Sequence, residues 1–140
     1  QQLESLHRIV TEVKQESLLA RPWRVMEMDC LKDNMDVLHF EYTTDIEIER
    51  DGRVHGFAGW FELDLSPGVM LDTSPYAKTT HWRQVYFPMP SFSVQRGDRL
   101  VTTLQTVSGS VGPDVIISAV LLRDGVDLYS FFYCYPGVGS

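Results

Sequence analysis

Alternating apolar and polar residues over most of the chain predict a protein built from β-strands. In the segment 45–49, Ile46 and Ile48 alternate with three acidic residues, as in a strand with one buried face and one solvated face. About eight short strands separated by turn residues predict an antiparallel β-barrel or sandwich. After residue 65, strands are expected at 69–72, 82–87, 92–95, 100–107, 115–122 and 128–135. The turns between strands are expected at Ser66-Pro67-Gly68, Arg96-Gly97-Asp98, 108–113 and Arg123-Asp124-Gly125.

The segment that follows residue 49 predicts a turn and then a long, irregular strand. Arg50-Asp51-Gly52-Arg53 contains an Asp-Gly pair of the kind that joins two antiparallel strands, so the segments on either side are expected to pair with each other. The next strand, Val54 to Leu65, contains Gly56 and Gly59. We expect a bend or bulge near one of these glycines.

The first residues of the chain show a different pattern. Apolar side chains recur there at spacings of three and four, with charged residues between them, which predicts an amphipathic helix from Leu3 to Leu18 that ends before Pro22. These apolar residues are Leu3, Leu6, Val10 and Val13. We therefore predict a mainly β fold in a single domain covering 1–140, with an N-terminal helical segment at 1–29 and a β-barrel at 30–140.

Composition and charge narrow the possible partners. The chain has 140 residues, of which 44% are hydrophobic, enough for one core. Its net charge of −7 opposes direct binding to nucleic-acid phosphates and attracts basic protein partners. On charge alone, the simpler interpretation is that the negative charge keeps the domain soluble.

The compartment and the ends of the chain follow from other features. No run approaches the roughly 20 apolar residues of a membrane span, and the start lacks the features of a secretory signal. Cys30 and Cys134 are expected to be reduced, as in an intracellular protein. The chain begins at Gln1 rather than Met, so we expect it to be a piece of a longer protein.

Candidate chemistry is sparse. The chain has no strand that leads through a glycine-rich turn into a helix, as a dinucleotide- or S-adenosylmethionine-binding domain requires, and no nucleophile elbow or zinc motif. Its four histidines have no metal-ligand spacing; they are His7, His39, His55 and His81. His81 precedes Trp82 at the end of a polar run, and a His beside a Trp on a loop can bind a planar cation such as a guanidinium group. The residues alone favour the alternative that Trp82 packs into the core and His81 caps a strand.

Three motifs, in the right order, resemble those of the protein arginine methyltransferases. Thr80-His81-Trp82, preceded by Thr73-Ser74-Pro75 and followed by Arg83-Gln84, resembles the Thr-His-Trp loop of that family. The run Val54 to Phe61 resembles a strand of the family in which His-Gly is followed by one apolar residue, two variable residues and then Trp/Tyr-Phe. Val94 to Asp98 resembles the family's later turn. The resemblance covers residues 16–135, and it is loose over 16–29, where Ser17 stands in place of the usual proline.

The resemblance implies a two-domain enzyme of which this chain is the C-terminal β-barrel. S-adenosylmethionine and the catalytic glutamates would belong to a domain absent from this chain, and no metal is expected. His81 would be the catalytic residue, paired with an acidic residue of that domain, and Thr80, His81 and Trp82 would contact the substrate arginine. The residues from Leu3 to Leu18 would be the return limb of the family's dimerisation arm, or the segment after it.

The resemblance also implies partners, a compartment and a product. We expect basic, arginine-containing protein substrates, a homodimer or heteromer, and a cytoplasmic or nuclear location. An intact Thr-His-Trp sequence is typical of members that make asymmetric dimethylarginine, although Gly56 to Glu62 is also similar to the symmetric class.

Two other functions are considered. One is a catalytically inactive regulatory or oligomerisation subunit of such an enzyme. The other is an unrelated all-β module that binds peptide or carbohydrate through aromatic residues such as Trp60, Trp82 and Tyr86.

Overall fold

The computed structural model describes residues 4–23, 25, 41–60, 62–66, 69–77, 84–108 and 113–137. Within these residues the chain forms β-strands and one short 3₁₀ helix, η1 (Gln15–Ser17). The strands are β1 (Glu4–Ser5), β2 (Ile9–Thr11), β3 (Glu41–Glu47), β4 (Gly52–Gly59), β5 (Glu62–Ser66), β6 (Val69–Asp72), β7 (Gln84–Val94), β8 (Arg99–Ser108), β9 (Pro113–Arg123) and β10 (Val126–Tyr135). The mainly β fold is therefore confirmed.

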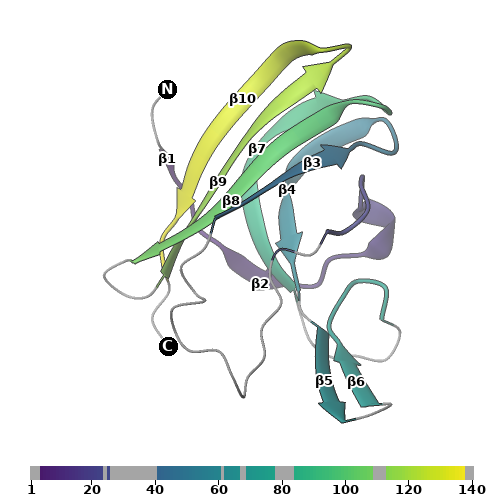
Figure 1. Ribbon diagram of the computed structural model, residues 1–140, viewed down its shortest axis with the longest axis vertical. Helices are drawn as coiled ribbons and strands as arrows, with labels where there is room; N and C mark the ends of the chain where they lie inside the picture. The colour runs from purple at the N-terminus through teal and green to yellow at the C-terminus, as the bar shows by residue number, and fades with distance from the viewer. Residues whose placement is uncertain are drawn as a thin grey trace.

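The described strands form two larger sheets and one hairpin. The five-stranded sheet has the order β1-β10-β9-β8-β3, and the three-stranded sheet has the order β2-β7-β4. Their pairings are antiparallel except that of β1 with β10, which is parallel. In Figure 1 the long strands β8, β9 and β10 curve across β7 and β4, and the β5–β6 hairpin projects from the lower end.

The core fills the space between the two larger sheets. Its centre is aromatic: the ring of Phe131 on β10 lies 5.7 Å from that of Phe92 on β7 and 5.4 Å from that of Tyr133. Burying each such side chain contributes about 1.5–3 kcal/mol. The other buried apolar residues include Ile46, Ile48, Val54, Met89, Val94, Leu100, Val115, Ile117, Ala119, Leu121 and Tyr135.

The expected alternation in segment 45–49 is confirmed. Ile46 and Ile48 are 7% and 2% exposed, respectively, whereas the three acidic residues between and beside them face solvent. The prediction of a strand at 69–72 is also confirmed, since β6 spans Val69–Asp72.

The separate strands predicted at 82–87 and 92–95 are instead one strand within the described residues, β7. The predicted break was wrong because Pro88 lies where the pairing is already irregular. The register shifts so that Val54 stands opposite Phe92 and Gly56 opposite Pro88, and a proline is tolerated where the ladder is interrupted. The same shift confirms the irregularity predicted near Gly56.

The predicted N-terminal helix is wrong. The chain forms β1, β2 and η1 in that region, and the N–H of Leu6 donates to the carbonyl of Cys134 at 2.7 Å. Ile9, Val10 and Thr11 are β-branched, which favours a strand, and β2 gains a partner in β7. Val10 is 63% exposed, so it does not belong to the buried stripe that the helical spacing implied.

The predicted pairing across Asp51-Gly52 is also wrong. β3 pairs with β8 and β4 pairs with β7, so this turn carries the chain from one sheet to the other. A two-residue type I′ hairpin needs positive φ at both central residues. Asp124 and Gly125 meet this requirement with φ of 53° and 77° and join β9 to β10, whereas Gly52 does not have a positive φ.

Candidate functional site

The candidate site residues Thr80, His81 and Trp82 lie outside the described residues, so their roles stay predictions. The structure describes the two ends of the segment that carries them. One end runs from Asp72 to Ala77, and the other begins at Gln84.

The first end is a compact, hydrogen-bonded turn. The Oδ1 of Asp72 accepts the N–H of Ser74 at 2.8 Å, and the Oγ of Ser74 accepts the N–H of Tyr76 at 3.2 Å. The carbonyl of Ser74 also accepts the N–H of Ala77 at 3.2 Å. Short polar side chains that bond their own backbone in this way fix a turn. The direction in which the chain leaves β6 is therefore defined.

The second end is fixed by a buried glutamine. Gln84 is the first residue of β7 and is 3% exposed. Its Oε1 accepts the N–H of Val13 at 2.7 Å, and its Nε2 donates to the carbonyl of Thr73 at 2.8 Å. One partner is a donor and the other an acceptor, so the amide has one satisfactory orientation. Gln84 belongs to the motif that resembles the family loop, but the sequence gave no sign of these two hydrogen bonds, because both partners are distant in sequence.

Two tyrosines and one cysteine have raised pKa values. Burial raises the pKa of Tyr86 and of Cys134, and it also raises the pKa of Tyr135. These groups are protonated at neutral pH. Cys134 is a free, buried cysteine. Cys30 lies outside the described residues, so the reduced state expected for the two cysteines stays a prediction.

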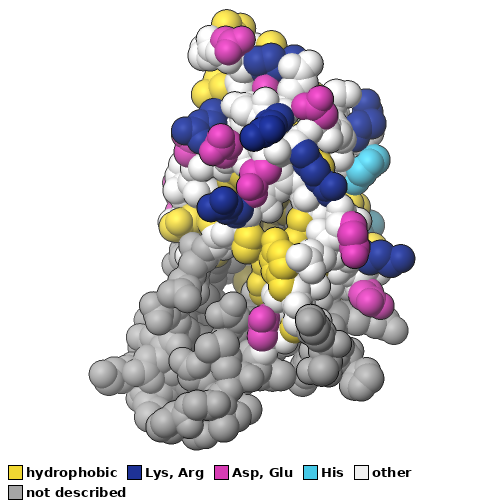
Figure 2. Space-filling view, turned by 90° about the vertical axis from the view of Figure 1, so that its right-hand side faces the viewer, with side chains coloured by type: hydrophobic (Ala, Val, Ile, Leu, Met, Phe, Trp, Pro, Cys, Tyr) yellow, Lys and Arg dark blue, Asp and Glu magenta, His cyan; other side chains and the backbone are white. Residues whose placement is uncertain are grey.

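The acidic row formed by Asp45 and Glu47 on β3 and by Glu49 just after it does not form a catalytic pair. The Asp45 and Glu47 carboxylates each lie 3.7 Å from the guanidinium of Arg99, and that of Glu49 lies 3.4 Å from Arg21. All five side chains are exposed, so these ion pairs contribute little to stability. Figure 2 shows acidic and basic side chains interspersed over the described part of the face seen there.

An open cavity of about 520 Å³ lies beside this row. Arg21, Pro22 and Trp23 line it from one side, and residues 44–49 of the β3 segment line it with Arg96 and Gly97. The cavity includes neither Asp72 nor Gln84, so it is separate from the ends of the candidate segment.

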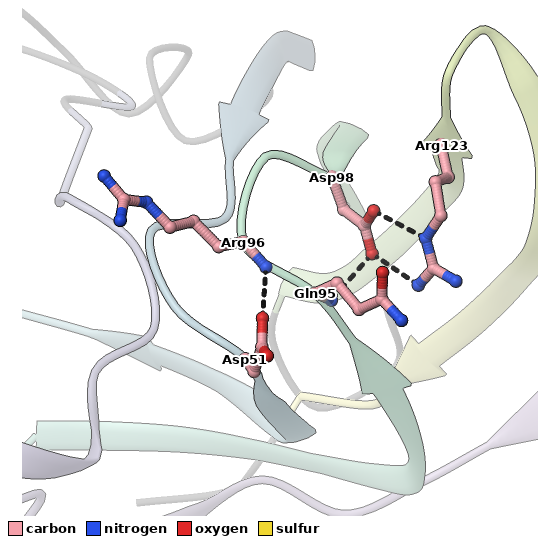
Figure 3. Close-up of polar contacts among 5 residues, drawn as sticks. All are labelled: Asp51, Gln95, Arg96, Asp98 and Arg123. Carbon is pink, nitrogen blue, oxygen red and sulfur yellow. Dashed lines mark hydrogen bonds and ion pairs between the residues drawn. The ribbon is translucent and has the colours of Figure 1, made fainter.

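The turn that follows β7 is held by an ion pair that sequence reasoning missed, between the buried Asp98 and the partly exposed Arg123 at the end of β9. Nε and a terminal nitrogen of Arg123 donate to the two carboxylate oxygens of Asp98, each at 2.8 Å, and the N–H of Gln95 donates to Oδ2 at 2.8 Å (Figure 3). The hydrogen bond from Arg123 holds the pKa of Asp98 below its usual value, although desolvation opposes this. Asp51 accepts the N–H of Arg96 beside it. These hydrogen bonds stabilise the turn. The sequence predicted the turn at Arg96-Gly97-Asp98 but not the partner of Asp98.

Two kinds of feature are absent from the described part of the chain. It contains no group of three or more His, Cys, Asp or Glu residues that could hold a metal ion. It also contains no helix long and apolar enough to cross a membrane.

Comparisons with known families and sequences place these features in context. Residues 1–113 match the family model described as "Arginine methyltransferase oligomerization subdomain". The chain is 34% identical over 121 residues to the histone-arginine methyltransferases CARMER of Drosophila persimilis and Drosophila yakuba. The match covers 78% of this chain and 23% of each relative, so the chain spans under a quarter of their length.

Solved structures show the same fold. A chain of the Trypanosoma brucei PRMT1 enzyme-prozyme heterotetrameric complex with AdoHcy superposes with a TM-score of 0.73 at 20% identity, over 92% of this chain and 44% of that one. Arabidopsis thaliana protein arginine methyltransferase 10 superposes with a TM-score of 0.82 at 21% identity, over 92% of this chain and 42% of that one.

Proposed function

Since the chain belongs to the protein arginine methyltransferase family, we propose that it forms the β-barrel part of an enzyme that methylates arginine in proteins. The methyl group would come from S-adenosylmethionine and go to a guanidinium nitrogen. The family match over residues 1–113 carries the proposal, because it includes both described ends of the segment with Thr80, His81 and Trp82. Family membership also displaces the unrelated binding module as an explanation.

The proposed task of the barrel is to present this segment to the substrate arginine. His81 would donate or accept a hydrogen bond at the rim of the active site, opposite an acidic residue outside this chain. Thr80 and Trp82 would shape the pocket, with the indole face suited to a guanidinium cation. Holding the guanidinium in one orientation removes much of the entropic cost of the reaction.

S-adenosylmethionine is proposed to bind to a domain outside this chain. The described residues contain no strand that leads through a glycine-rich turn into a helix, the arrangement that the cofactor site requires. When bound there, S-adenosylmethionine would supply the methyl group from its sulfonium sulfur and leave as the neutral thioether S-adenosylhomocysteine. The carboxylates that hold the positive charge of the substrate belong to the same proposal and to the same external domain.

The finer proposals concern product, partners and location. The intact Thr80-His81-Trp82 sequence supports asymmetric dimethylarginine as the product, made on basic protein segments. The oligomerization subdomain named in the family match supports a homodimer or a heteromer. The relatives named as histone-arginine methyltransferases support a nuclear or cytoplasmic location.

A catalytically inactive partner subunit is the second candidate. One structural neighbour comes from an enzyme-prozyme heterotetrameric complex, so this fold occurs in an assembly that pairs an enzyme with a prozyme. The complete Thr80-His81-Trp82 sequence favours the active enzyme, because an inactive subunit has no chemical need for it.

The test uses His81→Ala and Trp82→Ala in the complete gene product. Each is expected to lower kcat/KM for methyl transfer to an arginine-containing peptide by about 100-fold, the scale of a lost orienting contact. His7→Ala is the matched control, since His7 is exposed on the N-terminal segment and its loss should leave activity unchanged. Wild-type activity in both site variants would contradict the assigned roles. An inactive wild type that activates a related enzyme when mixed with it would favour the partner-subunit function.

A further inference from the structure

Gln84 links the two described ends of the segment that carries the candidate site residues. Its hydrogen bond to the carbonyl of Thr73 spans eleven positions of sequence and joins two residues that are 3% and 1% exposed. Among the described residues, β6 and β7 belong to different sheets and share no backbone ladder. A buried amide-to-carbonyl hydrogen bond, shielded from competing water, therefore joins the two ends in place of strand pairing.

The same side chain also bonds to the segment that follows β2 of the three-stranded sheet. Thr11 is the Cα partner of Gln84 at the end of the β2–β7 ladder, and Val13 lies two residues further along. The Oε1 of Gln84 accepts the N–H of Val13 at 2.7 Å. The side chain thus continues the connection between the two segments beyond the last paired residues.

The contact pattern selects glutamine in particular. The group at this position must accept one hydrogen bond and donate another from the end of a side chain of this length. An ionised glutamate accepts at both oxygens and donates nothing, and methionine offers at most a weak acceptor. Both replacements have a similar length, so they separate the hydrogen bonds from the volume of the side chain.

We propose that Gln84 is a positioning residue for the active site, acting through Thr80, His81 and Trp82. The inference rests on the proposed function for those three residues. Trp82 precedes Gln84 by two residues and Thr73 begins the turn at the other end, so the amide fixes both ends of the intervening chain. Gln84 itself has no contact with substrate in this proposal. Loss of the amide removes the hydrogen bonds of Gln84 to Thr73 and Val13, and with them the link between the two described ends of that chain.

The first test is kinetic and uses Gln84→Met in the complete gene product with an Arg-Gly peptide. A shift of about an ångström in an orienting group lowers rates by up to roughly 100-fold, so kcat/KM for the peptide is expected to fall about 10- to 100-fold. The Kd for S-adenosylmethionine should stay at its wild-type value. Asp98→Asn is the control, because Asp98 lies in the turn at the opposite end of β7. It should lower thermal stability and leave kcat/KM unchanged. An unchanged kcat/KM in Gln84→Met would overturn the proposal.

The second test is hydrogen exchange, which does not depend on activity. In Gln84→Met, the amides of Ser74, Tyr76 and Ala77 and that of Val13 should all exchange faster than in the wild type. In Gln84→Glu, the three turn amides should exchange faster while Val13 stays slow, because a carboxylate still accepts its N–H. The Glu variant decides the question if the Met variant does not fold. Unchanged exchange of the turn amides would overturn the proposal that Gln84 fixes both ends of the segment. Equally faster exchange of these amides in Asp98→Asn would overturn it as well.

The two tests separate the failure of this inference from the failure of the proposed function. A wild-type protein that transfers no methyl group to arginine removes the proposed function, and with it the catalytic meaning of Gln84. The exchange measurements then still decide whether Gln84 fixes the two ends of the segment.

Discussion

Replacing Asp98 with asparagine should destabilise the barrel and should do so in a pH-dependent way. The carboxylate is 2% exposed and accepts three hydrogen bonds of 2.8 Å, two from Arg123 and one from the N–H of Gln95. An asparagine presents one oxygen and one NH₂ group to these three donors. At least one donor must then face another N–H, and the negative charge is lost.

The size of the effect follows from the number and setting of these hydrogen bonds. A hydrogen bond to a charged group contributes about 1.5–3 kcal/mol. The Arg123 side chain is 33% exposed, and water screens its share of the interaction, so we take about 2 kcal/mol for Asp98→Asn. This corresponds to a fall in melting temperature of about 4–8 °C for a domain of this size.

The pH dependence gives the prediction its sign. Because the folded state lowers the pKa of Asp98, the unfolded chain takes up the proton first as the pH falls. The stabilisation is therefore complete above the ordinary pKa of about 3.9 and is lost as the pH falls further, through the lower pKa of the folded state. The gap between wild type and Asp98→Asn should be constant from neutral pH to about pH 5 and close below about pH 4.

Thermal melting followed by circular dichroism at several pH values measures this gap. Asp124→Asn is the matched control, since it removes the same charge from the exposed turn next to Arg123, and asparagine tolerates the left-handed backbone at that position. It should melt with the wild type. A variant Asp98→Asn that melts at the wild-type temperature at pH 7, or a gap that does not narrow as the pH falls below about 4, would refute the reasoning.

Two further predictions concern the pairing of β7. Gly56→Ala should lower the melting temperature, because an added Cβ would overlap the carbonyl oxygen of Phe87 and lie 2.9 Å from the ring of Tyr86. Overpacking of this kind costs about 1–3 kcal/mol, so a melting temperature equal to that of the wild type would contradict this close approach. Tyr135→Phe removes the hydrogen bond of 2.8 Å from the phenol to the carbonyl of Pro88, and denaturant unfolding should show a loss of about 1–2 kcal/mol, whereas no loss would mean that water replaces the phenol.

The sequence predicted most of the strands because each strand is a local pattern. Ile46 and Ile48 alternate with acidic residues, and that alternation is enough to give a half-buried strand wherever it pairs. The choice of partner depends on residues far along the chain. The Asp51-Gly52 pair illustrates this, since the same dipeptide type makes a hairpin at Asp124-Gly125 and a crossover between sheets at Gly52.

The N-terminal error has a related cause. Apolar residues at spacings of three and four fit a helix, but Ile9 to Thr11 also fit a strand, and pairing with β7 decided between them. A pattern over ten residues does not contain the partner.

The candidate site was predicted from motifs, but the hydrogen bonds that hold the ends of its segment could not be predicted. Thr80, His81 and Trp82 were selected by their resemblance to a known loop, and they lie outside the described residues. Gln84 belongs to the same run of sequence, but its importance depends on Val13 and Thr73, which are brought to it by the fold. Hydrogen bonds between distant segments leave no periodic trace in a single sequence.

Methyl transfer by the complete gene product is the measurement that tests the central claim most directly. The protein would be incubated with methyl-labelled S-adenosylmethionine and an Arg-Gly peptide, and the peptide would be hydrolysed and its amino acids separated. The account predicts label in asymmetric dimethylarginine, reduced strongly by His81→Ala and unaffected by His7→Ala. A folded protein that binds S-adenosylmethionine and leaves arginine unlabelled, alone and with a basic protein substrate, would contradict it.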